Sequence, residues 1–470
     1  MPLMQCEAVE LLTLIYRPNP HSSATPQQMA VLYLIFALGS LVDLDLPPYN
    51  SDADHYFDIA CAAMAIKPFF ENPTVVTVQA LTLISCYYAH GGQKFSMGSA
   101  WSTISLASSL SQRLGLHRES FSSQLPSKIS NRCRALFWEI YSIETLYGLS
   151  VGRPTGTCSS NINCPYPPDE PEDAQPFVKI YPGYRHARWE GTRIVTAPIM
   201  EAFLTTRKPS YDAVLAMDQA IREYIHSFSF ERFPKYENEP PSAFIQRHLI
   251  PLFGKTMLLY IHSGSFVEAM RDDSVHPLAS SYSVSFLAAY RNASEIIKAN
   301  IMNFASHPML FTRWWTIWTG LFNAAVVAGT IAIKYPNAQF APNAMAELFT
   351  AVDLFEKGTT SSGRARSGLA ILRRLRDKAI GYTPGTRAMN QLHDPSTIPK
   401  QKRSSVFFQD TPVLLPIRFY SRVRHRLLHP RNQDAGIRPF PRSGTTHRTF
   451  NGDLILPSSD TLIQRLRSQM

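Results

Sequence analysis

Apolar residues recur every three or four positions through most of the first 380 residues of the chain. That interval places them on one face of a helix with 3.6 residues per turn. No run of alternating β-branched and aromatic residues is bounded by hairpin turns, so strands are not predicted. We expect an all-α body of packed helical hairpins, with helices over residues 7–16, 26–44, 52–66, 74–89, 101–114, 131–149, 244–269, 284–304, 314–333, 342–356 and 365–379 and a helical pair within 177–235.

The stretch 98–154 has the clearest local pattern. Its first predicted helix, 101–114, is followed by Gly115, at the position where a left-handed backbone commonly closes a helix. Its second predicted helix, 131–149, is followed by Pro154, which cannot continue a helix and disfavours helical geometry at Arg153. The pattern therefore predicts two antiparallel helices joined by a loop.

The order of residues in this stretch resembles a known family. The chain reads Ala100-Trp101, Ser105-Leu106-Ala107, Gln112-Arg113-Leu114-Gly115-Leu116-His117-Arg118, Arg132-Cys133-Arg134-Ala135-Leu136-Phe137-Trp138 and Gly152-Arg153-Pro154. These segments look like the regulatory ("middle homology") domain of fungal zinc-cluster transcription factors. The chain departs from the family pattern in a shortened charged run before Trp138 and in Glu144, where aspartate is commoner.

The resemblance spans about residues 1–380 and implies one large regulatory domain there. Such a domain relays a signal or a metabolite state to transcription in the nucleus. The partners it implies are other transcription regulators or a DNA-binding subunit, and a small-molecule effector. The residues that match the family motif, and that we predict to have structural or regulatory roles, are Arg113, Gly115, His117, Arg118, Arg132, Arg134, Trp138, Gly152, Arg153 and Pro154.

The charged residues of the motif invite specific expectations. His117 follows a helix end, where a cation interacts favourably with the helix dipole and the unpaired carbonyls, and contact with a ligand or effector is the alternative role. Arg153 is expected to pair with a carboxylate, Glu139 or Glu144, in preference to a ligand. Arginines at the start of a helix are unfavourably placed, because a helix N-terminus prefers anions. Arg132 and Arg134 should therefore pair with acidic residues elsewhere or face a partner.

Charge is distributed unevenly along the 470 residues. The net charge is +10, and residues 381–470 contain 14 Lys and Arg against 5 Asp. The body, 1–380, is therefore near neutral, and the basic pI is no evidence of a DNA-binding face on it. Apolar periodicity fades after residue 380, so 381–470 is predicted to be a mostly disordered basic tail. Within it, Lys400-Gln401-Lys402-Arg403 is a candidate nuclear-import signal.

The six cysteines do not form a zinc cluster. They are Cys6, Cys61, Cys86, Cys133, Cys158 and Cys164, and no two are spaced as C-x-x-C. We expect no cofactor in this chain, with zinc belonging only to a missing N-terminal DNA-binding domain of the family type. DNA contact would then be indirect or through missing residues. A truncated gene model, a partner subunit that reads DNA and a lineage that lost its DNA reader all fit the sequence.

One segment has the length and composition of a membrane span. Residues 314–333 contain no charged side chain, and 20 helical residues cross about 30 Å. The segment also contains threonine, asparagine and glycine, and no second strong span accompanies it. We therefore interpret it as a helix buried on all sides within a helical domain and expect no membrane.

The common catalytic motifs are absent from the sequence. The enzymatic alternative is an all-α, Mg²⁺-dependent isoprenoid enzyme, for which Asp272-Asp273 is the only candidate pair. That pair lies in a loop-like stretch and lacks a further acidic residue three positions on. A free-standing helical module that binds a small molecule or a protein is the second alternative. We predict a transcription regulator that is not an enzyme.

Overall fold

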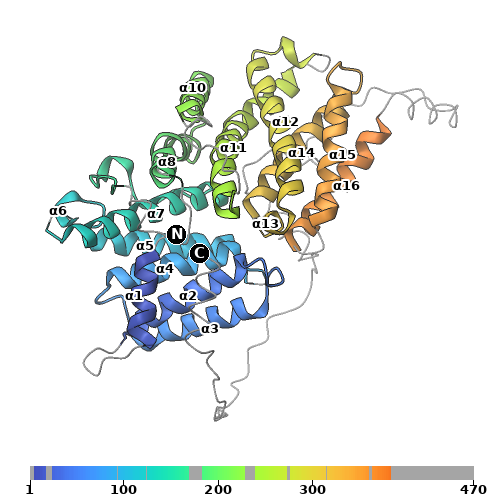
Figure 1. Cartoon of the computed structure of the whole chain (residues 1–470). Coiled ribbons are helices and arrows are strands. Elements are labelled where there is room, and N and C mark those ends of the chain that lie inside the picture. Colours follow the sequence, from blue (N-terminus) through green and yellow to red (C-terminus); the bar gives the residue numbers. More distant parts are fainter. Residues whose placement is uncertain are drawn as a thin grey trace, which may run out of the picture.

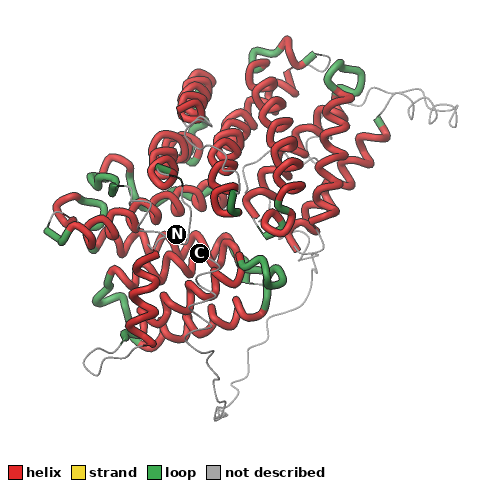
Figure 2. The backbone as a smooth tube through the Cα atoms, in the orientation of Figure 1, coloured by secondary structure: helices red, strands yellow, loops and turns green. Residues whose placement is uncertain are grey.

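The computed structural model describes residues 5–16, 24–92, 94–122, 124–168, 181, 183–227, 239–272, 276–313, 315–358 and 363–382. Over these residues the chain is helical and contains no β-strand, which confirms the all-α prediction (Figure 2). The predicted basic tail lies outside the described residues apart from Gly381 and Tyr382, and so does the import candidate 400–403. The domain boundary at residue 380 therefore stays a prediction.

The helices follow the predicted order along the chain (Figure 1). They are α1 (Gln5–Tyr16), α2 (Pro26–Val42), α3 (Ser51–Ile66), α4 (Val75–His90), α5 (Met97–Arg113), α6 (Glu119–Ser122), α7 (Ser127–Val151), α8 (Tyr184–Gly191), α9 (Ala197–Phe203), α10 (Tyr211–Ser227), α11 (Pro241–Asp272), α12 (Ser283–Ser306), α13 (Pro308–Phe311), α14 (Trp315–Lys334), α15 (Ala341–Gly358) and α16 (Gly363–Gly381), with short turns η1 (Ser159–Asn161), η3 (Thr192–Thr196) and η4 (Pro277–Ala279).

Local capping explains where several of these helices begin. The Thr25 hydroxyl accepts the Gln28 backbone N–H at 3.2 Å, and the Gln28 side chain accepts the Thr25 N–H at 2.9 Å. The same reciprocal arrangement opens α4, between Thr74 and Thr77. Each pair satisfies backbone donors that the first helical turn leaves without intrahelical partners.

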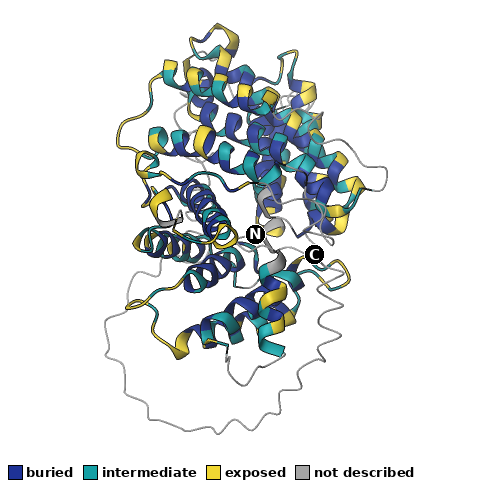
Figure 3. Ribbon diagram, turned by 60° about the vertical axis from the view of Figure 1, so that its left-hand side comes forward, coloured by how far each residue is buried: buried dark blue, intermediate teal, exposed yellow. Residues whose placement is uncertain are grey.

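Three large apolar cores divide the described residues into three groups of helices, and a small fourth core of Leu12, Leu32 and Phe36 joins α1 to α2. Helices α1 to α7 form an N-terminal array, α8 to α10 form a middle group with η3, and α11 to α16 form a C-terminal array (Figures 1 and 3). Helix α11 contributes to two cores, because Met257 and Ile261 face the middle group whereas Leu259 and Phe266 face the C-terminal array. The long helix thus joins these two groups.

Helix α7 joins the N-terminal array to the middle group. It packs against α4, α5 and α6 on one side and against α8, η3 and α9 on the other. Its residue Glu139 is only 2% exposed and accepts two hydrogen bonds from the Arg188 guanidinium of α8, at 3.1 and 3.3 Å. The Trp189 indole N–H donates to the same carboxylate at 3.3 Å. An ion pair between a buried carboxylate and a partly exposed guanidinium therefore holds α8 against α7.

Arg313 makes a direct contact between the N-terminal and C-terminal arrays. This residue lies in the short link between α13 and α14 along the chain and is 6% exposed. The guanidinium donates to the Leu41 carbonyl at 3.3 Å and also to the carbonyls of Asp43 and Leu46, at and just beyond the end of α2. A cation at this position interacts favourably with the carbonyls that the last helical turn leaves unpaired.

Helix α14 occupies the centre of the C-terminal array. Residues Ile317–Lys334 are long and apolar enough to cross a membrane by length and composition, and 78% of this window is buried inside the protein. The helix packs against α12, α15 and α16. The burial agrees with our interpretation of this segment as the core helix of a helical domain.

The described residues of 177–235 form two helical stretches, which confirms the predicted helical pair with its boundary near Pro209. The first stretch is α8, the π-helical turn η3 and α9 without a break, and the second is α10. The π turn inserts an extra residue, which the apolar spacing does not reveal. The structure corrects one other predicted element. The second helix of the hairpin begins at Ser127 instead of residue 131, because Pro126 marks its start.

Substitution by alanine should change the free energy of unfolding in opposite directions at two helical glycines, Gly148 and Gly264. A Cβ at Gly148 would lie 2.6 Å from the Arg153 carbonyl oxygen, whereas one at Gly264 would have no atom within 4 Å. Gly148→Ala should destabilise the protein by about 1–3 kcal/mol through overpacking. Gly264→Ala should stabilise it by about 0.5–1 kcal/mol through helix propensity. Urea denaturation followed by circular dichroism measures both, and equal midpoints for the two variants would contradict the packing described.

Removing Arg188 should leave a buried carboxylate without its cation. Arg188→Met should cost about 3–5 kcal/mol, as breaking a buried pair from one side does. The double variant Glu139→Gln/Arg188→Met should recover part of that loss, because no uncompensated charge remains. Urea midpoints at pH 7 compare the three proteins, and a loss below about 1 kcal/mol for Arg188→Met shows that the pair is not a stabilising contact.

The same pair should make stability depend on pH at the acidic end. Burial raises the pKa of Glu139, but the neighbouring Arg188 outweighs it and holds the pKa at about 2. A carboxylate with a depressed pKa stabilises the folded state above its unfolded pKa near 4.5, and that contribution is lost as pH falls towards 2. The difference in urea midpoint between wild type and the double variant should therefore shrink from pH 7 to pH 3.

Candidate functional site

The motif of the sequence forms the hairpin of α5 and α7 with the turn between them. Gly115 has φ of 81°, the left-handed conformation predicted for it. The Gly115 and Leu116 N–H groups donate to the carbonyls of Gln112 and Ser111 at 2.9 and 3.0 Å, which closes α5. Gly152 ends α7 in the same way, with φ of 69°.

The segment after α7 returns to the turn after α5. Asn163 donates its N–H to the His117 carbonyl at 3.0 Å and accepts the Glu119 N–H at 2.6 Å. Among the described residues, Arg118 and Asn163 form an isolated parallel bridge. The motif turn is thus held by a segment that follows it by more than forty residues, a pairing that local sequence patterns do not reveal.

The arginines of the motif tie helices of the N-terminal array together. Arg113 donates to the carbonyls of Phe70, in the link before α4, and of Glu71, the latter at 2.7 Å. Arg132 pairs with Glu10 of α1 at 2.9 Å, as the expectation of an acidic partner elsewhere required. Hydrogen bonds from Arg132 and Lys128 lower the pKa of Glu10 to about 2.

The remaining motif residues differ in exposure. Arg118 and Pro154 are exposed, and Arg134 is half-buried on α7. Trp138 is 3% exposed, and its indole N–H donates to the Pro165 carbonyl at 3.4 Å. The last contact brings Trp138 against the returning segment.

The prediction that Arg153 pairs with Glu139 or Glu144 is wrong. Its guanidinium lies 4.7 Å from the centroid of the ring of the half-buried Trp101 of α5, a cation–π contact. Glu139 pairs with Arg188, and Glu144 accepts the Gly156 N–H at 3.1 Å. Gly152 turns the backbone outward before Arg153, whereas both carboxylates face inward from α7.

The expected cationic role of His117 is also wrong. The ring is buried, and the Arg118 Nε–H donates to its Nε2 at 3.1 Å. Burial and the Arg118 charge both lower the pKa of His117, which favours the neutral ring. The structural contact of His117 is made by its backbone carbonyl, which accepts the Asn163 N–H, and not by a positively charged ring.

Glu144 lies at the centre of the hairpin without a cation beside it. It is fully buried, and burial raises its pKa although hydroxyls of Ser105 and Ser108 lie near it. In the described part of the chain its Oε2 has no hydrogen-bond partner, and the same holds for the Oγ of the neighbouring Ser105. Glu144 and Ser105 thus form a buried polar pair with unused hydrogen-bonding capacity inside the motif.

A cleft of about 310 Å³ opens between the hairpin and the returning segment. Trp138 and Tyr141 of α7 form its aromatic floor, and Arg193 of the π turn η3 lies at its edge. The volume is at the lower limit for small-molecule sites, and π turns occur frequently at functional sites. Its lining residues are Glu119, Trp138, Tyr141, Ser159, Ile162, Asn163, Cys164, Pro165 and Arg193.

Tyr166 connects the cleft to the middle group of helices. Its ring centroid lies 4.4 Å from that of Trp138 and 4.4 Å from that of His186, and Arg193 lies 5.7 Å above it. No site role is predicted from the sequence for Tyr166, Asn163 or Arg193, because these residues lie outside the hairpin pattern. The position of an aromatic residue between prolines was the one available signal.

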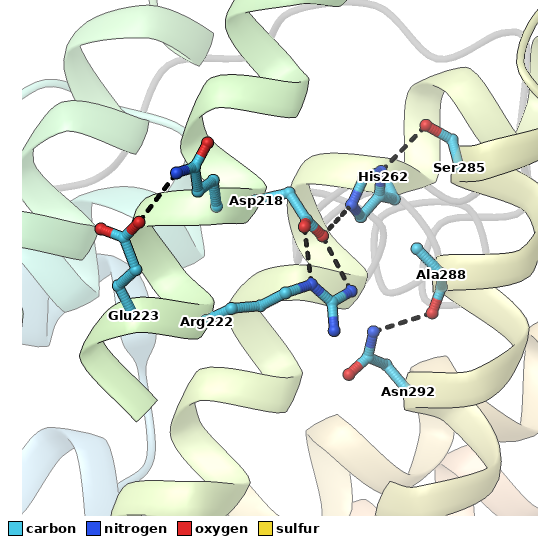
Figure 4. Close-up of polar contacts among 8 residues, drawn as sticks. Asp218, Arg222, Glu223, His262, Ser285, Ala288 and Asn292 are labelled. Carbon is cyan, nitrogen blue, oxygen red and sulfur yellow. Dashed lines mark hydrogen bonds and ion pairs between the residues drawn. The ribbon is translucent and has the colours of Figure 1, made fainter. Parts of the chain in front are cut away.

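A second polar cluster, invisible in the sequence, joins α10, α11 and α12 (Figure 4). His262 lies 2.7 Å from Asp218 Oδ1 through Nε2 and 2.9 Å from Ser285 Oγ through Nδ1. Arg222 donates to Asp218 at 2.6 Å. These are the side chains of a nucleophile, base and acid, but His262 and Ser285 are both 0% exposed and inaccessible to a substrate. Their geometry is that of a structural tie.

The acidic pair considered for Mg²⁺ is only half described. Asp272 ends α11 and accepts the Ser280 hydroxyl at 2.8 Å, whereas Asp273 lies outside the described residues. No group of three or more His, Cys, Asp and Glu side chains that would suit a metal ion occurs within the described ranges.

Comparison with known proteins places this hairpin in a wider context. Residues 10–180 match the model of the family described as the fungal specific transcription factor domain. An uncharacterized transcriptional regulatory protein of Schizosaccharomyces pombe is 25% identical over 72% of this chain and 44% of its own length. A second such protein of that organism is 25% identical over 33% of this chain and 19% of its own length.

The chain therefore spans less than half the length of the curated relatives it matches. No solved structure gives a significant match. The family match covers the whole α5–α7 hairpin, the segment that returns to it and most of the cleft lining. Over residues 10–180, the chain is similar to the fungal specific transcription factor domain.

Proposed function

We propose that this chain regulates transcription and that its helical body receives a signal and relays it to other components of the transcription machinery. The observation that supports this most directly is the family match over 10–180, which includes every motif residue singled out in the sequence. The relative that aligns with 72% of the chain is itself described as a transcriptional regulatory protein, and that alignment extends beyond the family match.

The cleft is the proposed site for a small effector. Its aromatic floor suits a flat apolar group, and Arg193 and Glu119 at the rim offer charges of both signs for orientation. The π turn that contains Arg193 lies in the middle group, whereas the floor belongs to the N-terminal array. A molecule in the cleft would therefore contact two groups of helices and bias their relative position.

The proposed function involves no catalysis. The one nucleophile–base–acid arrangement in the described residues is buried, and its members are occupied as a tie between helices. The proposal includes nuclear localisation and partnership with other regulators. It also includes zinc, which would be bound by a family-type DNA-binding domain outside this chain. A free-standing ligand-binding module is the second candidate, favoured by the cleft alone.

Tethering tests the proposed function independently of any DNA-binding region of its own. The full chain is fused to a heterologous DNA-binding domain upstream of a reporter gene in a fungal cell. Reporter transcription should change several-fold relative to the DNA-binding domain alone. Gly264→Ala serves as the folded control, and an unchanged reporter with a folded fusion protein would count against a role in transcription.

Filling the cleft tests the effector site in the same assay. Asn163 is exposed and lines the cleft, and Asn161, also exposed, does not. Asn163→Trp should shift the reporter output towards one extreme, because its indole occupies the space meant for the effector. Asn161→Trp should behave as wild type. Identical output from both variants, with thermal midpoints equal to wild type, excludes the cleft as the effector site.

A further inference from the structure

The solvent-facing side of α16 is strongly basic. Helix α16 packs its apolar stripe against α14 and α15, at one edge of the C-terminal array (Figure 1). Its opposite side exposes Arg366, Arg373, Arg374 and Lys378 with the single acidic residue Asp377. The helix therefore has a fixed orientation, in which burial of leucines on one side holds the cations of the other side towards solvent.

Only part of this charge is compensated by neighbouring side chains. Glu356 of α15 pairs with Arg373 at 2.9 Å and lies 3.9 Å from Arg376. Arg366 and Arg374 form no ion pair among the described residues. Two guanidinium groups on the same helix side are therefore available to an external anion.

The basic excess of the whole chain begins with this helix. Residues 363–470 contain 20 of the 46 Lys and Arg but only 6 of the 36 Asp and Glu. The residues before them contain the remaining 26 basic and 30 acidic side chains, which makes that part slightly acidic. The α16 face is thus the described part of a cationic region, next to a body of opposite sign.

The chemistry of the face favours phosphate over a protein partner. The large apolar side chain exposed on α16 is Ile380, at 39%, and specific protein interfaces require a core of buried apolar or aromatic anchors. Arginine binds phosphate through a bidentate fork. Along α16, Arg374 follows Arg366 by eight residues and Lys378 follows Arg374 by four, which are rises of about 12 and 6 Å along the helix axis. The three cations together therefore span a length equal to about five base pairs of DNA.

We propose that the exposed face of α16 binds the phosphate backbone of double-stranded DNA without reading its sequence. The proposal rests on the proposed function for the choice of DNA, because a transcription regulator acts beside it. The DNA contact would position the protein through a helix distant from the α5–α7 hairpin (Figure 1). The proposal is tested by a binding measurement on the purified chain, so a negative result there is distinguishable from a negative result in the reporter assay.

The experiment measures fluorescence anisotropy of a labelled random-sequence duplex with the full chain over a series of salt concentrations. Each phosphate contact contributes about −0.9 to the slope of log affinity against log salt. Arg366→Ala/Arg374→Ala should therefore reduce the slope by about two and weaken binding roughly tenfold at low salt. Arg366→Lys/Arg374→Lys should keep the wild-type slope, because the charges remain.

The exposed pair Arg207 and Lys208, which follows α9, supplies the matched control. Arg207→Ala/Lys208→Ala removes two positive charges elsewhere and should leave the slope unchanged. An unchanged slope in the α16 double alanine variant, or an equal decrease in the control, overturns the proposal. Polyglutamate serves as the competing probe. If the α16 variant loses polyglutamate binding but keeps duplex binding, the face takes an acidic polypeptide and the proposal is wrong.

Discussion

The buried carboxylate of Glu139 sets the position of the middle group of helices relative to the N-terminal array. It lies within α7, and because the carboxylate is removed from water, its charge requires a cation beside it. Arg188 of α8 supplies that cation, and the Trp189 indole N–H adds a further hydrogen bond. Apolar packing tolerates small sliding movements, but a hydrogen-bonded ion pair has a defined geometry. The pair therefore specifies how the middle group docks on the N-terminal array.

The cleft depends on that docking. Its floor is fixed within α7, while Arg193 belongs to the π turn that follows directly after α8. Tyr166 packs between Trp138 and His186 and so contacts both sides. A small movement of α8 on α7 would change the width of the cleft, and filling the cleft would in turn resist that movement. This reciprocity is the physical basis for the proposal that the cleft binds an effector.

The C-terminal array is connected to this centre by two kinds of contact. Helix α11 shares apolar cores with the middle group and with the C-terminal array, so it transmits position through packing. Arg313 reaches the carbonyls at the end of α2 and couples the same array to the first helices of the chain. The buried tie of Asp218, His262 and Ser285 strengthens the junction of α10, α11 and α12. Each of the three groups of helices therefore contacts both of the others.

The sequence by itself determined the all-α class, the order of the helices and the closure of α5 at Gly115, because apolar spacing and glycine conformation are local properties. It also revealed the family motif. The partners of Arg153 and His117, the cleft with Arg193, and the Ser–His–Asp tie were decided only by the tertiary structure. Each depends on where a side chain distant in sequence comes to lie, and burial, not residue type, then decides whether that side chain is charged, paired or accessible.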